Sequence, residues 1–221
     1  GDAVLVTGCG LSETRDGGYS EYARVEAKWA IPLPAGLSVR EAMILGTAGF
    51  TAALSLYRME ANGQTPEMGP VVVTGATGGV GMLAIDLLTT AGYEVHAISG
   101  KPEQFDALVA LGARQCIARQ QLDLGSRPLE TAIWAGAIDN VGGAIHDTVM
   151  TQINLRARIV VCGTISTYNN TAGQDDIGPR QLRAQGDRRS GGGHHLLDLA
   201  PFGQLGLRID QDVLDVGRVP F

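Results

Sequence analysis

Residues 71–81, VVVTGATGGVG, join a continuous apolar strand to a glycine-rich turn and then to the start of a helix. Gly78 leaves no side chain in the way of a diphosphate group that approaches the turn. Gly81 allows the new helix to pack closely against the strand. A strand, a glycine turn and a helix in this order together predict a dinucleotide-binding site. The chemistry expected here is the binding of a pyrophosphate by main-chain amides.

The anion is expected to meet Thr77, Gly78, Gly79 and Val80. The amides of Gly79 and Val80 belong to the first helical turn, where N–H groups lack acceptors within the helix. The pattern reads A-x-G-x-x-G, because Ala76 stands where the usual fingerprint has its first glycine. The two close-approach positions remain glycine, so the physical argument still holds. No Gly-Lys-Ser or Gly-Lys-Thr ending follows, which excludes a mononucleotide P-loop.

The end of the next predicted strand indicates which dinucleotide is bound. A carboxylate about twenty residues after the glycines would accept hydrogen bonds from the ribose of NAD and would repel a 2′-phosphate. No acid occupies that place, since Ile98 is followed by Ser99, Gly100 and Lys101. Their hydroxyl, amide and ammonium groups suit a phosphate, and Arg119 could close the same pocket from the side. The sequence therefore predicts NADPH as the cofactor.

Other reactive side chains do not suggest a second site. A catalytic zinc needs three ligands from Cys, His or a carboxylate, and a structural zinc needs closely spaced cysteines; neither pattern appears, so no metal is expected. His96 and His146 fall in predicted elements and are interpreted as structural, whereas His194 and His195 are interpreted as solvent-exposed. No nucleophile and base pair is visible, and no catalytic residue is assigned. Hydride transfer needs no such pair, because the cofactor carries the chemistry.

Alternating strands and helices must position these residues. The expected strands cover residues 70–74, 93–98, 115–118, 137–140 and 158–162, and the expected helices cover residues 80–91, 103–111 and 146–153. Successive strand and helix units specify a parallel sheet with right-handed crossovers. The predicted fold class is α/β, a doubly wound parallel Rossmann sheet that is incomplete at its C-terminal side, with five of six strands visible.

A different pattern precedes this sheet. Residues 3–7 and 19–25 are expected to form two strands of a partial antiparallel layer. Ser38 and Glu41 have the spacing of a capping box, so a helix is expected to begin at Ser38. The helical pattern is interrupted near Gly46, where two helices are expected to meet.

Composition limits the class of protein. A net charge of -6 and a pI near 5.2 argue against a nucleic-acid partner, which would require clustered Lys and Arg. No apolar run approaches the roughly 18 residues of a membrane span, so no membrane association is expected. The three cysteines lack short spacings and fit a reducing cytosol, so the expected location is cytoplasmic. Residues 183–193, RAQGDRRSGGG, are expected to form a loop or to be disordered.

Several phrases resemble the medium-chain dehydrogenase/reductase superfamily, zinc-free quinone oxidoreductase type: GTAGFT at 46–51, WAGAID at 134–139 and IPLP at 31–34. Residues 1–143 resemble its acryloyl-CoA reductase branch. The resemblance implies that Thr77 to Val80 hold the pyrophosphate, that residues 99–101 with Arg119 hold the 2′-phosphate, and that Thr47 contacts the cofactor. It also implies NADPH-dependent hydride addition to an activated carbon–carbon double bond or a quinone.

Residues from about 139 to 182 look more like the sister branch of prostaglandin and alkenal reductases. The phrases DNVGG at 139–143 and CGTISTYNN at 162–170 carry this second resemblance. It implies that Asn140 lines the nicotinamide side of the cofactor, together with Cys162, Gly163 and Tyr168. Two branches in succession raise the hypothesis of a hybrid or misassembled gene.

The resemblance divides the chain into a remnant of a GroES-like catalytic domain (1–45), an NADP-binding Rossmann domain (46–178) and an atypical tail (179–221). Members of the family carry further residues ahead of Gly1 and continue differently after Leu182, so truncation and a frameshifted tail are the hypotheses for the two ends. The expected partner is a small-molecule substrate, an activated alkene or quinone, and a homodimer is a candidate assembly. The alternatives are a non-catalytic NADPH-binding fragment or sensor without a complete substrate pocket, and a partly folded fragment without function.

Overall fold

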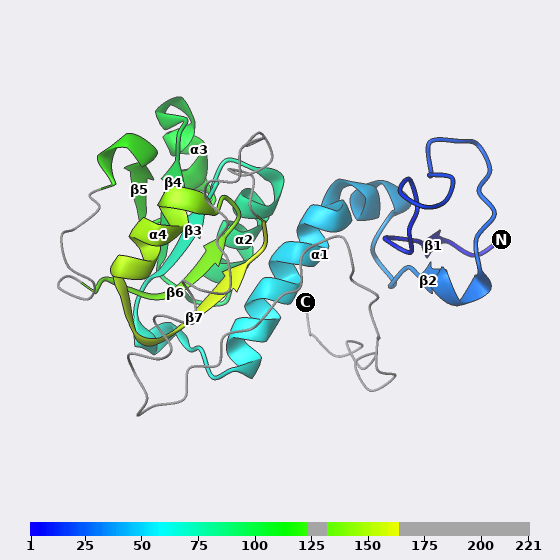
Figure 1. The fold of residues 1–221 in the computed structure, drawn as a ribbon. Helices are drawn as coiled ribbons and strands as arrows, with labels where there is room; N and C mark the ends of the chain where they lie inside the picture. Colours follow the sequence, from blue (N-terminus) through cyan, green and yellow to red (C-terminus); the bar gives the residue numbers. More distant parts are fainter. Residues whose placement is uncertain (123–131, 164–221) are drawn as a thin grey trace.

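A parallel sheet is the main structural element in a computed structural model that describes residues 1–122 and 132–163 (Figure 1). Its five strands have the order β5-β4-β3-β6-β7. The strands are β3 (Val71–Thr74), β4 (Val95–Ser99), β5 (Gln115–Ala118), β6 (Trp134–Asp139) and β7 (Ile153–Val161). All five strands predicted for this sheet are present, although β6 and β7 begin earlier than expected. The strand order is that of a Rossmann sheet, and the predicted fold class is confirmed.

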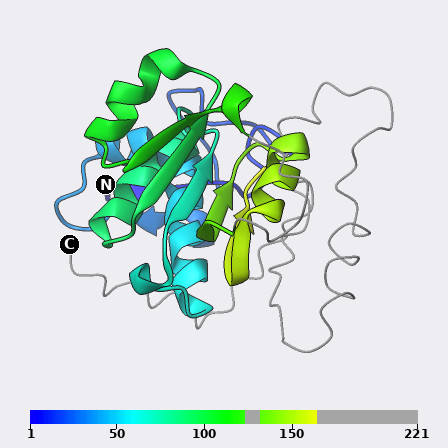
Figure 2. The same ribbon diagram turned by 90° about the vertical axis from the view of Figure 1, so that its left-hand side faces the viewer.

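Helices cover both faces of the sheet (Figure 2). They are α1 (Val39–Ala61), α2 (Gly79–Thr90), α3 (Phe105–Ala110) and α4 (Gly143–Thr151), with short 3-10 turns η1 (Ala27–Trp29), η2 (Pro66–Met68), η3 (Pro102–Gln104) and η4 (Arg119–Gln121). One core cluster joins the sheet to α1, α2 and α3, and a second joins the opposite face to α4. Because both faces are covered, the three valines of β3 are fully buried and the strand reads as one apolar run.

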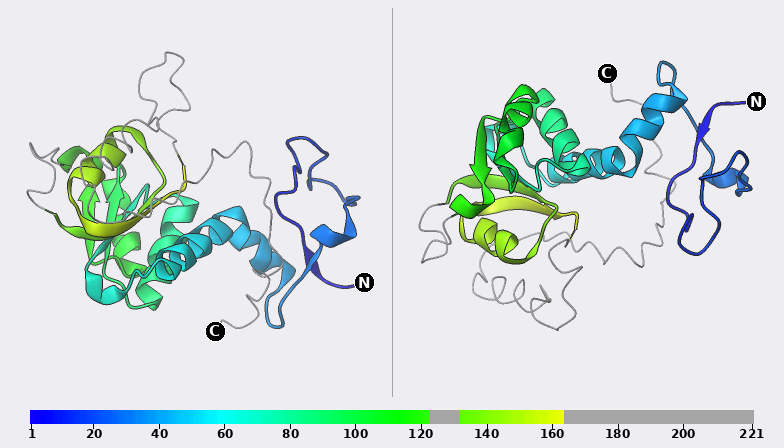
Figure 3. Two further views of the ribbon diagram at one scale, coloured as in Figure 1. Left: turned by 60° about the horizontal axis from the view of Figure 1, so that its bottom comes forward. Right: turned by 90° about the horizontal axis from the view of Figure 1, so that it is seen from above.

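The long helix α1 begins and bends where the sequence predicts. Ser38 caps it in a capping box, since its hydroxyl oxygen accepts from the amide of Glu41 and the Glu41 carboxylate accepts from the amide of Ser38. Gly46 has φ 48° and ψ -152°, so the helix is interrupted there. The two expected helices therefore meet at Gly46 as one kinked element. Its second half packs against α2, and its first half leads away from the sheet toward the N-terminal segment (Figure 3).

The N-terminal segment contains a short antiparallel pair, β1 (Val4–Leu5) with β2 (Ile31–Pro32). A strand at residues 3–7 is thus confirmed over part of its length. The strand expected at residues 19–25 is wrong, because the structure has no regular element there. Tyr19 and Tyr22 are fully exposed, so this run has no apolar face to bury, and β1 pairs with Ile31–Pro32 instead.

Some expectations fall beyond the described residues. They are the loop at 183–193, the tail at 179–221, the last part of the proposed Rossmann domain and Tyr168. Among the helices that are described, none has the length and apolar character needed to cross a membrane.

Candidate functional site

The glycine turn after β3 leads into α2 without a side-chain cap. Gly75 has a positive φ of 59°, and its carbonyl accepts a hydrogen bond of 2.9 Å from the amide of Gly78. Gly78 is the N-cap of α2, and within the described part of the chain no side chain caps this helix start. Gly78 and Gly79 are exposed. The start of α2 is therefore exposed and uncapped at the position where the sequence predicts an anion site.

Gly81 has a packing role that only glycine can fill. A Cβ atom there would lie 2.4 Å from the Gly75 carbonyl oxygen and 2.7 Å from Ala76 Cα. A side chain at this position would thus push α2 away from the turn. Ala76 itself is fully buried in the core, so its methyl group does not occupy the exposed mouth of the turn. This placement explains how alanine is accommodated where the usual fingerprint has glycine.

The second half of α1 lies beside the turn. A Cβ atom on Gly79 would be 3.4 Å from the Cβ of Ala48, an ordinary contact distance. Thr47, the residue before Ala48, is exposed and follows the Gly46 kink directly. The structure therefore brings Thr47 to the neighbourhood of the glycine turn, although the two lie in separate elements.

The residues predicted to hold a 2′-phosphate gather at the end of β4. The hydroxyl oxygens of Thr77 and Ser99 are 3.0 Å apart, which links the glycine turn to this strand end. The Ser99 hydroxyl also accepts a hydrogen bond of 3.1 Å from the amide of Lys101. The Arg119 guanidinium lies over Gly100, because a Cβ atom there would be 3.3 Å from Arg119 Cζ. A side chain at Gly100 would thus crowd the guanidinium.

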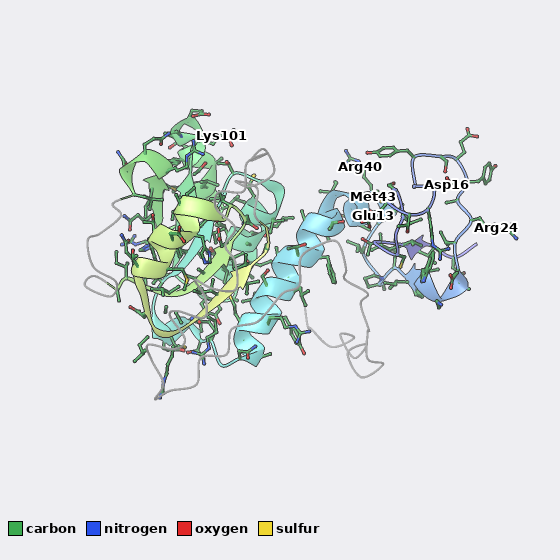
Figure 4. All side chains as sticks on the ribbon, in the orientation of Figure 1. Glu13, Asp16, Arg24, Arg40, Met43 and Lys101 are labelled. Carbon is green, nitrogen blue, oxygen red and sulfur yellow. The ribbon has the colours of Figure 1, made fainter. Side chains whose placement is uncertain are left out.

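Lys101 and Arg119 are both exposed, so their charges are available at the surface. Arg119 follows β5, whose Ala118 pairs with Ser99 of β4. Parallel pairing thus places the two cationic residues at the same edge of the sheet. Figure 4 shows Lys101 on the sheet body, well away from the N-terminal segment that carries Glu13 and Asp16.

Asn140 follows β6 on the other side of the glycine turn. Its amide donates to the Thr74 hydroxyl (2.9 Å), and its side-chain Nδ2 donates to the Thr74 carbonyl (2.8 Å). Its side-chain Oδ1 is buried and has no hydrogen-bond partner among the described residues. A Cβ atom on Gly75 would lie 3.4 Å from Asn140 Cβ and 3.1 Å from Val141 Cγ2, so the β6 end abuts the glycine turn.

Asp139 and its partners are a part of this region that the sequence reasoning missed. The Asp139 carboxylate is fully buried and accepts hydrogen bonds from the Thr74 hydroxyl and from the amides of Val141 (3.1 Å) and Gly142 (3.2 Å). His146 Nδ1 lies 2.8 Å from its Oδ2. Burial alone raises the pKa of this carboxyl, but hydrogen bonds from His146 and Thr74 outweigh it, so the pKa lies below its ordinary value. One signal was available in the sequence, since a threonine and an acid end two apolar strands.

The residues that follow β7 lie beside those that end β6. The amide of Cys162 donates to the Asp139 carbonyl (2.7 Å), and a Cβ atom on Gly163 would lie 3.3 Å from the Asn140 carbonyl oxygen. The Cys162 thiol is 3.3 Å from the hydroxyl of Ser55, a residue of α1 that sequence reasoning did not select. Burial raises the pKa of this thiol, which therefore stays protonated near neutral pH. Cys162, Gly163 and Asn140 are thus neighbours.

Potential metal ligands do not cluster within residues 1–122 and 132–163. No three His, Cys, Asp or Glu side chains there are grouped closely enough to hold an ion. His146, which lies in α4, faces Asp139, and His96, which lies in β4, accepts from Trp134. Both histidines have structural partners, in agreement with their interpretation from sequence.

Comparison with known proteins gives a family match. The family model described as "Zinc-binding dehydrogenase" matches residues 79–197. Acrylyl-CoA reductase AcuI of Ruegeria pomeroyi is 49% identical over 164 residues, which are 74% of this chain and 50% of that protein. The putative quinone oxidoreductase YhfP of Bacillus subtilis is 47% identical over 164 residues, again 74% of this chain and 50% of that protein. The chain thus spans about half the length of these curated relatives.

Prostaglandin reductases also match. Prostaglandin reductase-3 of Mus musculus is 31% identical over 183 residues, 79% of this chain and 46% of that protein. Among solved structures, the YhdH oxidoreductase of Salmonella enterica in complex with NADP has a TM-score of 0.72 and 44% identity. The match covers 83% of this chain and 56% of that one. Both branches named by the sequence resemblance are therefore among its relatives.

Proposed function

Because this chain belongs to the zinc-binding dehydrogenase family of the medium-chain dehydrogenase/reductase superfamily, we propose that it is an NADPH-dependent oxidoreductase that reduces an activated carbon–carbon double bond or a quinone. One observation carries the proposal. The uncapped start of α2, the end of β4 with Ser99 and Lys101, and the end of β5 with Arg119 lie at the same edge of a Rossmann sheet. Such an edge, at the topological switch point, is where dinucleotides bind in this fold.

The described side chains fit NADPH on three counts. Gly78 and Gly79 are exposed at a helix start that suits a diphosphate. Arg119 lies over Gly100 with its charge exposed, which suits a 2′-phosphate. The buried Oδ1 of Asn140 is an acceptor without a partner in the described structure, which suits a donor group on the ligand.

In the proposed complex the amides of residues 77–80 hold the pyrophosphate, and residues 99–101 with Arg119 hold the 2′-phosphate. Asn140, Cys162, Gly163 and Tyr168 line the nicotinamide side, and Thr47 contacts the cofactor. When bound, NADPH supplies the hydride that adds to the electron-poor carbon of the substrate. The protonated Cys162 thiol adds no negative charge to this edge. No catalytic residue is assigned in the protein.

Proposals on the domain division, the reaction and the substrate accompany the proposed function. We propose a domain division at residues 45 and 178, a zinc-independent reaction and a small-molecule substrate such as an enoyl-CoA, an alkenal or a quinone. The names of two relatives, an acrylyl-CoA reductase and a putative quinone oxidoreductase, support the enoyl-CoA and quinone classes. The cytoplasmic location, the homodimer and the hybrid origin stay predictions.

The decisive experiment measures NADPH and NADH affinities by fluorescence titration. Arg119→Glu and Lys101→Glu are each expected to weaken NADPH binding by about 10- to 100-fold, since they replace a charged phosphate contact, and to leave NADH binding unchanged. Arg114→Glu is the matched control, because Arg114 is also exposed but precedes β5 at the opposite edge of the sheet. An unchanged preference in both site variants would contradict the phosphate pocket.

Turnover is then tested by NADPH oxidation with acryloyl-CoA, an alkenal and a quinone. Oxidation with any of them supports the reductase. Saturable NADPH binding without oxidation would instead support the alternative, a non-catalytic binding module.

A further inference from the structure

The hydrogen bonds around Thr74 point to a positioning role outside the predicted cofactor contacts. We propose that Asp139, acting through the Thr74 hydroxyl, holds the main chain of Asn140 in place, so that the side-chain oxygen of Asn140 faces the nicotinamide half of the cofactor. The inference rests on the proposed NADPH site and adds to it the residues that orient one of its walls. Asp139 and Thr74 are positioning residues, because each acts on the ligand through Asn140.

The orientation of the Asn140 side chain follows from its partners. The Thr74 carbonyl can only accept a hydrogen bond, so the Asn140 side-chain atom 2.8 Å away must be Nδ2, and Oδ1 must face elsewhere. Oδ1 then lies in a nearly closed environment, because Asn140 is 8% exposed, and it has no partner in the described residues. A buried acceptor left in this state is costly unless a ligand donates to it.

The Thr74 hydroxyl connects the main-chain N–H of Asn140 to Asp139. A hydroxyl has one proton, and here it is donated to the Asp139 carboxylate, which leaves the oxygen to accept from the Asn140 amide at 2.9 Å. The same carboxylate accepts from the amides of Val141 and Gly142. Asp139 therefore holds the start of the turn directly and holds Asn140 through Thr74.

The strand order identifies which half of the ligand meets Asn140. β3 lies between β4 and β6, and the proposed 2′-phosphate contacts are at the end of β4. A dinucleotide with its diphosphate at the β3 turn must then extend its other half over β6, about 5 Å from β3. That half carries the ribose hydroxyls and the carboxamide N–H groups, which are the donors that Oδ1 requires.

A truncated ligand separates the two halves. Adenosine 2′,5′-bisphosphate keeps the 2′-phosphate and lacks the nicotinamide half, so its binding should not depend on Asn140. The experiment measures the dissociation constants of NADPH and of this bisphosphate by titration calorimetry. The variants are Asn140→Ala, Thr74→Val and Thr74→Ser, with Asn62→Ala as the matched control. Asn62 also donates from Nδ2 to a main-chain carbonyl, but it lies at the end of α1.

Asn140→Ala and Thr74→Val are expected to weaken NADPH binding by about 3- to 10-fold, the effect of one lost hydrogen bond, with the bisphosphate unchanged. Thr74→Ser retains the hydroxyl and is expected to bind NADPH as the wild type does. Asn62→Ala is expected to change neither ligand. Thermal unfolding is followed in each variant, and if Thr74→Val does not fold, Thr74→Ala removes the same hydroxyl and tests the same link, with the same selective loss expected.

The outcomes distinguish the inference from the proposed function. A wild-type chain that fails to bind NADPH would overturn the proposed function, and the inference with it. A wild-type chain that binds NADPH, with variants that weaken both ligands equally, would overturn only the inference, because the role would then be structural. A Thr74→Ser variant that binds NADPH as poorly as Thr74→Val would also overturn it.

Discussion

Two buried histidines lie at opposite ends of β6, and each lies beside an acid in a different environment. At the carboxyl end, His146 faces Asp139, the last residue of the strand. At the amino end, Trp134, the first residue of the strand, donates from its indole to His96 Nδ1 at 3.0 Å. His96 Nε2 lies 3.0 Å from the Glu94 carboxylate. Because Nδ1 accepts, Nε2 carries the proton, and the tautomer is fixed by the two partners.

The two acids differ in exposure. The Asp139 side chain is fully buried, whereas that of Glu94 is 52% exposed. Water therefore screens the pair of His96 and Glu94, whereas the pair of His146 and Asp139 depends on the protein for its solvation. The two ends of β6 also differ in their hydrogen bonding. Near Glu94 the Trp134 indole donates to the His96 imidazole, whereas near Asp139 the Oδ1 atom of Asn140 has no partner in the described structure. Similar residue types thus build a structural contact at one end and a candidate binding edge at the other.

The largest effect is expected from Asp139→Ala. This change leaves His146, the Thr74 hydroxyl and two main-chain amides without their common acceptor. Removing one member of a buried pair typically costs about 3–5 kcal/mol, so the free energy of unfolding should fall by that amount. Urea denaturation measures it. A loss below about 1 kcal/mol would mean that water reaches this carboxylate, and the contrast between the two ends of β6 would disappear.

Acid should weaken the same end selectively. The pKa of Asp139 lies below its ordinary value of 3.8 in the folded protein, so its contribution to stability is complete above that pH. It is lost as the pH falls below about 4 and through the folded pKa, because the unfolded chain then binds the proton more readily. Urea denaturation at steps of about one pH unit, from about pH 6 to about pH 3, gives the free energy of unfolding across this range. Asp139→Asn should show a shallower decline than the wild type, and equal slopes would contradict the assignment.

The sequence predicts the sheet well because its strands are buried on both faces. Continuous apolar runs such as that of β3 are easily recognised in a sequence. The turn after β3 is equally recognisable, because position 81 has no room for a side chain and therefore requires glycine. The grouping of Ser99 with Arg119 could also be predicted, because parallel strands end at one edge. The strand expected at residues 19–25 failed for the opposite reason: this short run has no partner surface, and the local sequence pattern does not reveal that.

The network around Asp139 was missed for a further reason. Thr74, Asp139 and His146 come from three separate elements, and their hydrogen bonds depend on which strands are neighbours. The predicted Rossmann sheet places β6 beside β3, but the sequence pattern does not show which side chains at the two strand ends bond to one another. The pairing of Ser55 with Cys162 has the same character, because α1 and the end of β7 meet only in the folded protein.

At the amino end a smaller loss is expected from His96→Ala. The Trp134 indole is 1% exposed and would lose its acceptor, and an unsatisfied buried donor costs about 1–3 kcal/mol. His96→Gln can return an acceptor to the indole and should recover part of the loss. Urea denaturation gives the stability, and NADPH titration should show unchanged affinity in both variants. Weakened cofactor binding would contradict the assignment of this end as purely structural.

The smallest effect is expected from Glu94→Ala, which removes the exposed acid and leaves the bond between Trp134 and His96 intact. Exposed ion pairs contribute about 0–1 kcal/mol, because water solvates both charges and salt screens them. The free energy of unfolding should therefore fall by less than about 1 kcal/mol, and any loss should shrink further in high salt. If Glu94→Ala costs as much as Asp139→Ala, exposure does not explain the difference between the two ends, and the orientation of His96 by Glu94 would have to be the stabilising term.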